Sequence, residues 1–211
     1  ISGLLSGPCR AYSPAKGKRR TWPAGLTMTK KQASRQAFNI VIVGQSGRLQ
    51  YEALLFAASL RHSAPDFKGR FFVAVPQAGP NWSSNPAITN DQVLATLDRL
   101  GAEILPFDTP VFGESYPQGN KILAAAAPRK CDVSVFLDTD MVLAEPVDFA
   151  EQLGDALIAA CVSDYKSQAG DDEDWDHYYG VFDMQTPPER VQFNGGRRLM
   201  SPPYYNTGMD V

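Results

Sequence analysis

The stretch Val133-Ser134-Val135-Phe136-Leu137-Asp138-Thr139-Asp140 decides how the rest of this 211-residue sequence is interpreted. Its first five residues form an apolar run with the length and composition of a buried strand. The run leads directly into two carboxylates, and side chains at positions i and i+2 of a strand point the same way. We therefore expect Asp138 and Asp140 to present oxygens to one side, at the end of a buried strand.

Two such carboxylates suit a hard divalent cation, which proteins commonly hold between one or two carboxylates and the phosphates of a substrate. The pattern therefore predicts a site for a phosphorylated substrate. The same spacing recurs at Asp172-Glu173-Asp174 and Asp174-Trp175-Asp176, in a polar stretch that we interpret as a solvated loop. For Asp138 and Asp140, the alternative interpretation is a pair of exposed carboxylates that only solubilise a strand end.

Upstream of this stretch, apolar runs alternate with segments of helical periodicity. Strands are expected at 38–43, 69–75, 102–105 and 133–137, with a helix after each of the first three. Asn90 and Asn120 are expected to cap the second and third helices. In the first helix, the residues expected to face inward are Tyr51, Leu54, Leu55, Ala58 and Leu60.

This alternation predicts an α/β fold with a mostly parallel sheet flanked by helices and right-handed crossovers. Ligands bind such sheets outside the carboxyl ends of the strands. Gly44-Gln45 and Asp138-Thr139-Asp140 both follow strands at such ends. We expect these two loops to converge on one crevice.

The pattern is less regular downstream. Helical turns are expected at 149–153 and a fifth strand at 156–162, whereas 163–201 is interpreted as a long, mobile, polar excursion. The sequence stops in what resembles an interrupted strand at Val211. We therefore expect the domain of 37–211 to be incomplete at its C-terminus.

The net charge of −3 conceals an asymmetry, since residues 1–51 carry nine Lys or Arg and no Asp or Glu. We interpret residues 1–36 as a basic leader that is disordered or not part of the native protein. Met28 is a plausible natural start, and residues 1–27 would then be upstream sequence. A transit peptide or a nucleic-acid-binding arm are the alternatives. We expect no nucleic-acid partner for the folded part.

Three cysteines, Cys9, Cys131 and Cys161, show neither C-x-x-C nor zinc spacing, which favours a reducing, cytoplasmic setting. No apolar run approaches the roughly 18 residues of a membrane span. We expect no such span.

The sequence also resembles a known family. Asn120-Lys121-Ile122-Leu123, an Ala-rich helix, the strand ending in Asp138-Thr139-Asp140 and the stretch Pro146-Val147-Asp148-Phe149 are similar to the core of GT-A-fold glycosyltransferases. The closest likeness is to the family that contains glycogenin and bacterial galactosyltransferases. A later Asn-Ser/Thr-Gly strand of that family resembles Asn206-Thr207-Gly208. The resemblance covers 38–209.

The resemblance implies a Rossmann-like sheet and transfer of a sugar from a nucleotide-diphosphate donor to a saccharide, lipid-linked or protein acceptor. It implies that Asp138 and Asp140 hold Mn²⁺ or Mg²⁺ and carry the catalysis, and that a third ligand lies beyond Val211. His62 and His177 do not match that ligand. The positions implied to contact the donor are Val43, Gly44, Gln45, Tyr51, Lys121, Thr139 and Asn206.

Two other functions remain open at this point. In a haloacid-dehalogenase-type phosphatase, an apolar strand also ends in D-x-D, and Asp138 would be the nucleophile and Asp140 the acid/base. That motif normally follows the first strand of its domain, whereas three strand–helix units precede Asp138 here. The other alternative is a non-catalytic module that only binds a nucleotide-sugar.

Overall fold

The computed structural model describes residues 38–128, 133–146, 149, 160–162, 172–192 and 200–210. Three expectations concern residues outside these ranges: the basic leader at 1–36, the predicted helical turns at 149–153 beyond residue 149, and residues 156–159 of the predicted fifth strand.

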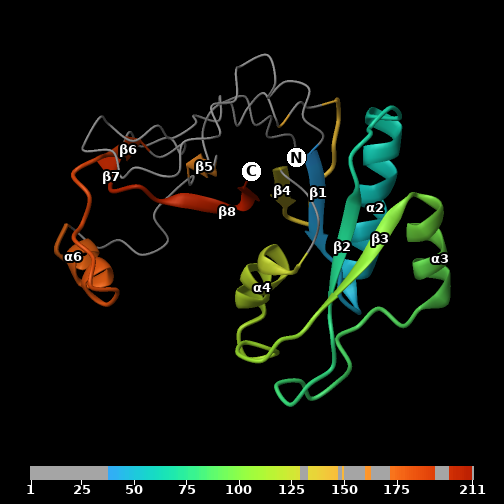
Figure 1. The fold of residues 1–211 in the computed structure, drawn as a ribbon, viewed down its shortest axis with the longest axis horizontal. Coiled ribbons are helices and arrows are strands. Elements are labelled where there is room, and N and C mark those ends of the chain that lie inside the picture. Colours follow the sequence, from blue (N-terminus) through green and yellow to red (C-terminus); the bar gives the residue numbers. More distant parts are fainter. Residues whose placement is uncertain are drawn as a thin grey trace, which may run out of the picture.

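A six-stranded sheet forms the body of the described structure (Figure 1). Its strands are β1 (Phe38–Val43), β2 (Phe71–Pro76), β3 (Ala102–Phe107), β4 (Val133–Leu137), β5 (Ala160–Val162) and β8 (Tyr205–Asp210). The spatial order is β3-β2-β1-β4-β8-β5. β1 to β4 are mutually parallel where they pair, and β8 is antiparallel to both β4 and β5. The predicted α/β class with a mostly parallel sheet is confirmed.

Helices cover both faces of the parallel strands (Figure 1). The remaining elements are α2 (Arg48–Ser63), α3 (Asp91–Arg99), the 3₁₀ turn η1 (Pro117–Gly119), α4 (Asn120–Ala126), α6 (Asp172–Gly180), β6 (Val191–Gln192) and β7 (Met200–Ser201). α2 and α3 pack on one face of the sheet and α4 on the other. The crossover order β1-α2-β2-α3-β3-α4-β4 is the predicted one.

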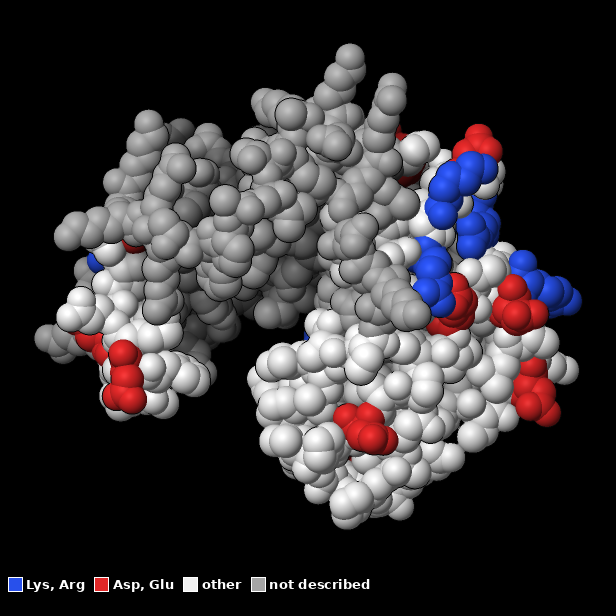
Figure 2. Space-filling model, in the orientation of Figure 1, with Lys and Arg blue, Asp and Glu red and all other residues white. Residues whose placement is uncertain are grey.

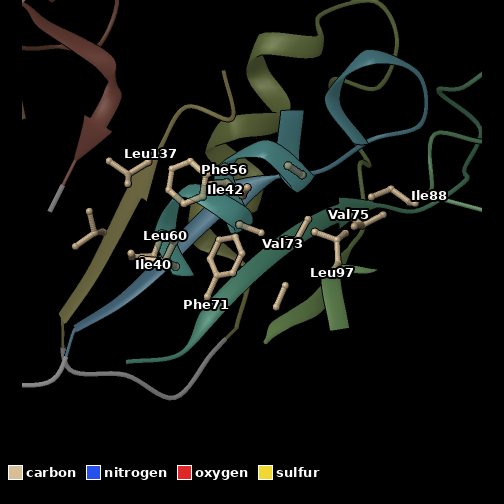
Figure 3. Packing of buried hydrophobic residues seen from close by; sticks show 14 of the residues in the cluster. Ile40, Ile42, Phe56, Leu60, Phe71, Val73, Val75, Ile88, Leu97 and Leu137 are labelled. Atoms are coloured by element: carbon tan, nitrogen blue, oxygen red, sulfur yellow. The ribbon is translucent and has the colours of Figure 1, made fainter. Parts of the chain in front are cut away.

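Alternating residues of the central strands supply the two hydrophobic layers. On the α2 side, Ile40, Ile42 and Val73 meet Phe56 and Leu60 (Figure 3). The opposite layer contains the intervening strand residues packed against α4, namely Val41, Val43, Phe72, Ala74 and Phe136. Because both faces are covered, these strands are largely apolar, with Asn39 and Ser134 as the polar residues of β1 and β4. This explains why the apolar runs of the sequence predict the strands well.

The inward face of α2 differs from the prediction. Tyr51 and Leu55 are 56% and 60% exposed, and Ala58 is also exposed. The buried stripe instead contains Gln50, Ala53, Phe56, Ala57 and Leu60. The two small alanines, four residues apart, let the helix lie close to the sheet, while the ring of Phe56 stacks on Phe71 with centroids 5.5 Å apart.

Of the two predicted helix caps, one is confirmed and the other is wrong. Asn90 caps α3 as expected, since its Oδ1 accepts hydrogen bonds from the backbone N–H groups of Gln92 and Val93. Asn120 does not cap α4: the capping position belongs to Gly119, and Asn120 is the buried first residue of the helix. The expected excursion at 163–201 is also more regular than predicted, because it contains α6 and the β6–β7 pair.

In the part of the chain that the structure describes, no helix is long and apolar enough to cross a membrane. In Figure 2, the described Lys and Arg side chains gather over α2 and α3, interspersed with Asp and Glu. Below them, the surface over the loops after β2 and β3 is nearly uncharged in this view. The charged face is thus a mixed one, and Arg48–Glu52 and Arg70–Glu103 are ion pairs within it.

Candidate functional site

The carboxyl ends of the four parallel strands share one edge of the sheet, and the loops that follow them build the candidate site. These loops comprise 44–47, 77–90, 108–116 and 138–140. A crossover helix runs antiparallel to its strands, so the N-terminus of α4 also lies at this edge. Residues far apart in the sequence therefore meet here.

The Asp138-Thr139-Asp140 segment is a turn, because β4 ends at Leu137. Asp138 is half-buried, Thr139 is buried and Asp140 is exposed. The side-chain alternation of a strand therefore stops before these residues, and the expectation that Asp138 and Asp140 point the same way as strand residues is wrong in its basis. What distinguishes the two carboxylates from Thr139 is that the threonine alone points into the protein.

Thr139 attaches this turn to the neighbouring strand. Its hydroxyl donates a hydrogen bond of 2.6 Å to the backbone carbonyl of Val43, the last residue of β1. Thr139 retains only 6% of its exposure and Val43 only 8%. The contact brings the turn beside Gly44 and Gln45, so the expected convergence of the two loops occurs.

Lys121 contacts the first carboxylate of the turn. Its Nζ donates to Oδ1 of Asp138 in an ion pair, and the two side chains are 34% and 26% exposed. Lys121 is the second residue of α4, which begins at the edge where β4 ends. The lysine is therefore not a freely solvated residue at a helix start.

Close packing explains the glycine at position 44. Its N–H donates to the carbonyl of Ala74 at 2.8 Å, which extends the β1–β2 ladder by one residue. A Cβ built at Gly44 would lie 2.4 Å from Cγ1 of Val73 and 3.1 Å from Cδ1 of Ile88. Gly47 differs, since a Cβ there meets nothing within 4 Å but its φ of +85° favours glycine.

The loops after β2 and β3 brace each other. Nε1 of Trp82 donates to Oγ1 of Thr109 at 2.6 Å, and Nδ2 of Asn81 donates to the Thr109 carbonyl at 3.0 Å. The N–H of Ser83 donates to the Glu114 carboxylate at 2.8 Å, and hydrogen bonds from Ser83 lower the pKa of Glu114. These contacts hold two walls of the site at a fixed separation.

Two predicted positions are less closely joined to the turn. Tyr51 lies on the exposed face of α2. Asn206 belongs to β8, whose Met209 pairs with Leu137 in an antiparallel register. Because Asn206 precedes Met209 by three residues, its backbone lies beyond the carboxyl end of β4, at the edge of the site. Its side chain is outside the described part.

The donor chemistry of the site suits a hard cation. The two carboxylates of the turn are oxygen ligands of the kind Mg²⁺ and Mn²⁺ accept. Oδ1 of Asp138 already has a positive group, the Lys121 ammonium, against it. Among the described residues, no cluster of three His, Cys, Asp or Glu side chains could hold a metal, so further ligands would come from a bound phosphate or from elsewhere in the chain.

The acidic repeats at 172–176 lie on α6, where the sequence reasoning expected a solvated loop. Backbone positions two apart on a helix are about 200° apart around its axis, unlike the same-face positions i and i+2 of a strand. His177 is exposed on the same helix and His62 is exposed near the end of α2.

Sequence reasoning missed the role of Asn120 and the anchoring role of Thr139. Asn120 is 2% exposed, and its Nδ2 donates to the carbonyl of Gly113 at 3.0 Å, which ties the start of α4 to the loop after β3. The available signal was composition: a polar β-branched residue between two carboxylates has to satisfy its hydroxyl when it is buried.

Comparison with known proteins adds a family. The model of the Rhodobacterales glycosyltransferase domain matches residues 40–211. Comparison with curated protein sequences gives no significant match. Among solved structures, the chain is similar to galactosyltransferase LgtC in complex with donor and acceptor sugar analogues (TM-score 0.47) and to an active-site mutant of LgtC (TM-score 0.49). Each is 19% identical, and each alignment covers 82% of this chain.

This chain spans 56% of the length of those LgtC chains. The family match covers the parallel strands, the Asp138-Thr139-Asp140 turn and β8 together. It confirms the glycosyltransferase resemblance noted in the sequence. The chain belongs to the Rhodobacterales glycosyltransferase domain family.

Proposed function

We propose that this chain is the donor-binding part of a metal-dependent glycosyltransferase that moves a sugar from a nucleotide-diphosphate donor to a saccharide, lipid-linked or protein acceptor. The observation that carries the proposal is the Asp138-Thr139-Asp140 turn, fixed to the carboxyl end of β1 by the Thr139–Val43 hydrogen bond. Family membership favours sugar transfer over the phosphatase alternative.

Asp138 and Asp140 are the residues that would hold Mn²⁺ or Mg²⁺. When bound, such a cation supplies Lewis-acid stabilisation of the negative charge on a departing diphosphate. Asp138 directly follows the central strand β4, and the Thr139 hydrogen bond holds the turn that carries both carboxylates against the end of β1. Lys121 contributes a second positive charge at the same edge, suited to phosphate oxygens.

Val43, Gly44 and Gln45 would hold the base and ribose of the donor. Gly44 is buried and lets the loop pass close to Val73 and Ile88, and the half-buried Gln45 beside it offers a side-chain amide to the donor. The N–H of Ser46 donates to the carbonyl of Pro86 at 2.9 Å, so this loop is tied to the wall after β2. Asn206, at the same edge, would bind sugar hydroxyls.

Thermal unfolding with ligands tests this proposal. A ligand that binds only the native state raises the melting temperature, by an amount equivalent to about 2.7 kcal/mol at a concentration 100 times its Kd. We expect Mn²⁺ and a nucleoside diphosphate together to give a larger shift than the sum of their separate shifts. Incubation with nucleotide-sugars should release free sugar slowly if the chain is catalytic.

Asp138→Asn should abolish the metal-dependent part of the shift, because it removes the negative charge that attracts the cation. Asp98→Asn, on the exposed face of α3, is the matched control and should keep the full shift. A metal response that survives in Asp138→Asn contradicts the proposal. Binding without sugar release, also in a C-terminally extended protein, indicates the non-catalytic binding module.

A cytoplasmic location stays a prediction from the cysteine content. The nature of the acceptor is likewise proposed only as a class, a saccharide, lipid or protein that carries a hydroxyl group for the transferred sugar.

A further inference from the structure

The start of α4 is held in place from two directions. Asn120 donates to the Gly113 carbonyl, and Ala124 and Ala127 are buried against β1 and β2 in the second hydrophobic layer. The backbone of Lys121 is therefore fixed at the edge of the sheet. Its side chain, by contrast, carries four methylene groups and can redirect the ammonium without moving the helix.

The ammonium of Lys121 and a divalent cation would compete for the Asp138 carboxylate. Lys121 Nζ contacts Oδ1 of Asp138, and the two side chains remain 34% and 26% exposed. A pair that is partly open to water is held weakly. Two positive charges within about 4 Å of each other repel, so a cation on either oxygen of this carboxylate weakens the lysine contact.

We propose that Lys121 occupies Asp138 in the empty site and is displaced when a cation and a diphosphate bind, whereupon the freed ammonium moves to the diphosphate oxygens. The inference rests on the proposed function. It makes Lys121 a positioning residue that couples the two ligands: the cation alone must displace the lysine without compensation, whereas the diphosphate offers the displaced ammonium a new partner. Metal and nucleotide then bind cooperatively.

The test measures the affinity for Mn²⁺ by the electron paramagnetic resonance signal of free Mn²⁺, with and without saturating nucleoside diphosphate. Lys121→Met should raise the affinity for Mn²⁺ alone by about three- to tenfold, since it removes both the competitor and a repelling charge. The same variant should reduce the gain in Mn²⁺ affinity that nucleotide produces by about tenfold or more. Lys121→Arg should keep both values near those of the native protein.

Lys68→Met is the matched control. Lys68 is an exposed lysine before β2, at the amino edge of the sheet, 4.0 Å from Asp66. Its loss should change neither affinity. If Lys121→Met fails to fold, judged by its melting temperature and circular dichroism, Lys121→Gln replaces it.

Two outcomes overturn the inference: Mn²⁺ alone binds the lysine-free variant no more tightly than the native protein, or the nucleotide-dependent gain survives intact. Failure of the proposed function gives a different result, because then native protein and Asp138→Asn bind Mn²⁺ and nucleotide equally. A lysine variant with unchanged affinities, beside an Asp138→Asn variant that has lost them, rejects only the displacement.

Discussion

The hydroxyl of Thr139 donates a 2.6 Å hydrogen bond to the carbonyl of Val43, and so joins two loops that are 96 residues apart. This contact sets the position of Asp138 and Asp140 relative to the loop after β1. A carboxylate pair on an unattached turn could satisfy the same sequence pattern without forming a site next to Gly44 and Gln45. Thr139, the middle residue of the motif, therefore positions the two carboxylates that flank it.

Thr139→Val should cost about 1–3 kcal/mol of unfolding free energy, because it keeps the shape of the side chain but removes the donor to a buried carbonyl. Thr139→Ser keeps the hydroxyl and should cost less than about 1 kcal/mol. Urea denaturation measures both. We also expect Mn²⁺ affinity to fall in Thr139→Val and to stay close to native in Thr139→Ser. Equal destabilisation by the two variants would count against the anchoring role.

Gly44→Ala and Gly47→Ala should both destabilise the protein, but for different reasons. At Gly44, the new methyl group meets the buried Val73 side chain, and overpacking of this kind costs about 1–3 kcal/mol. At Gly47 there is space, and the cost of about 1–3 kcal/mol comes from the backbone alone, because φ +85° with ψ −137° is a conformation that glycine adopts far more readily than other residues. In a Val73→Ala background, Gly44→Ala should cost less unfolding free energy than in the native protein, whereas the cost of Gly47→Ala should be unchanged. A double-mutant cycle measures both differences.

Trp82→Phe should weaken the brace between the loops after β2 and β3. The lost Nε1 hydrogen bond leaves the buried hydroxyl of Thr109 without its donor, at a cost of about 1–2 kcal/mol. In the double variant with Thr109→Val, the additional loss should be small, because both partners of the bond are gone. Additive losses in denaturant melts would show that Trp82 stabilises by packing alone.

Stability should depend on pH through Glu103. Arg70 donates two hydrogen bonds to this carboxylate on the neighbouring strand, and they lower the pKa of Glu103 in the folded state. A lowered folded pKa stabilises the protein above the unfolded pKa, and this contribution disappears as the pH falls through the folded pKa. Both side chains are about half exposed, so the contribution is at most about 1 kcal/mol.

Glu103→Gln should therefore be less stable than the native protein at neutral pH, with the difference vanishing between about pH 5 and pH 3. High salt at neutral pH should also reduce it. Glu145→Gln, at an exposed position after the Asp138 turn, serves as the control. If the stability difference between Glu103→Gln and the native protein is the same at about pH 3 and at neutral pH, the proposed role of the Glu103 carboxylate is wrong.

The strands were predictable because burial on two faces leaves an unmistakable apolar run. Phe38–Val43 and Val133–Leu137 have the bounds expected from the sequence. Asn90 was predictable as a cap because capping depends only on the next three residues. Local rules suffice where the stabilising partners are local.

The remaining features depend on partners that are distant in sequence. The apolar residues of α2 permit two inward faces, and the sheet selects the one with Ala53 and Ala57 because small side chains allow closer approach. Asn120 has the sequence context of a helix cap, but its side-chain amide instead donates a hydrogen bond to the Gly113 carbonyl in the loop after β3. The pairing of Lys121 with Asp138 likewise requires knowing that α4 begins where β4 ends.

The placement of β8 between β4 and β5 has a consequence for biosynthesis. Leu137 pairs with Met209, so the edge of β4 that faces β8 stays unpaired until about 70 further residues have been translated. At about 5–20 residues per second, this takes several seconds. During that interval the nascent chain presents an unpaired, apolar strand edge of the kind that templates aggregation. Translation pauses downstream of residue 137 should therefore lower the yield of soluble protein more than pauses placed before it.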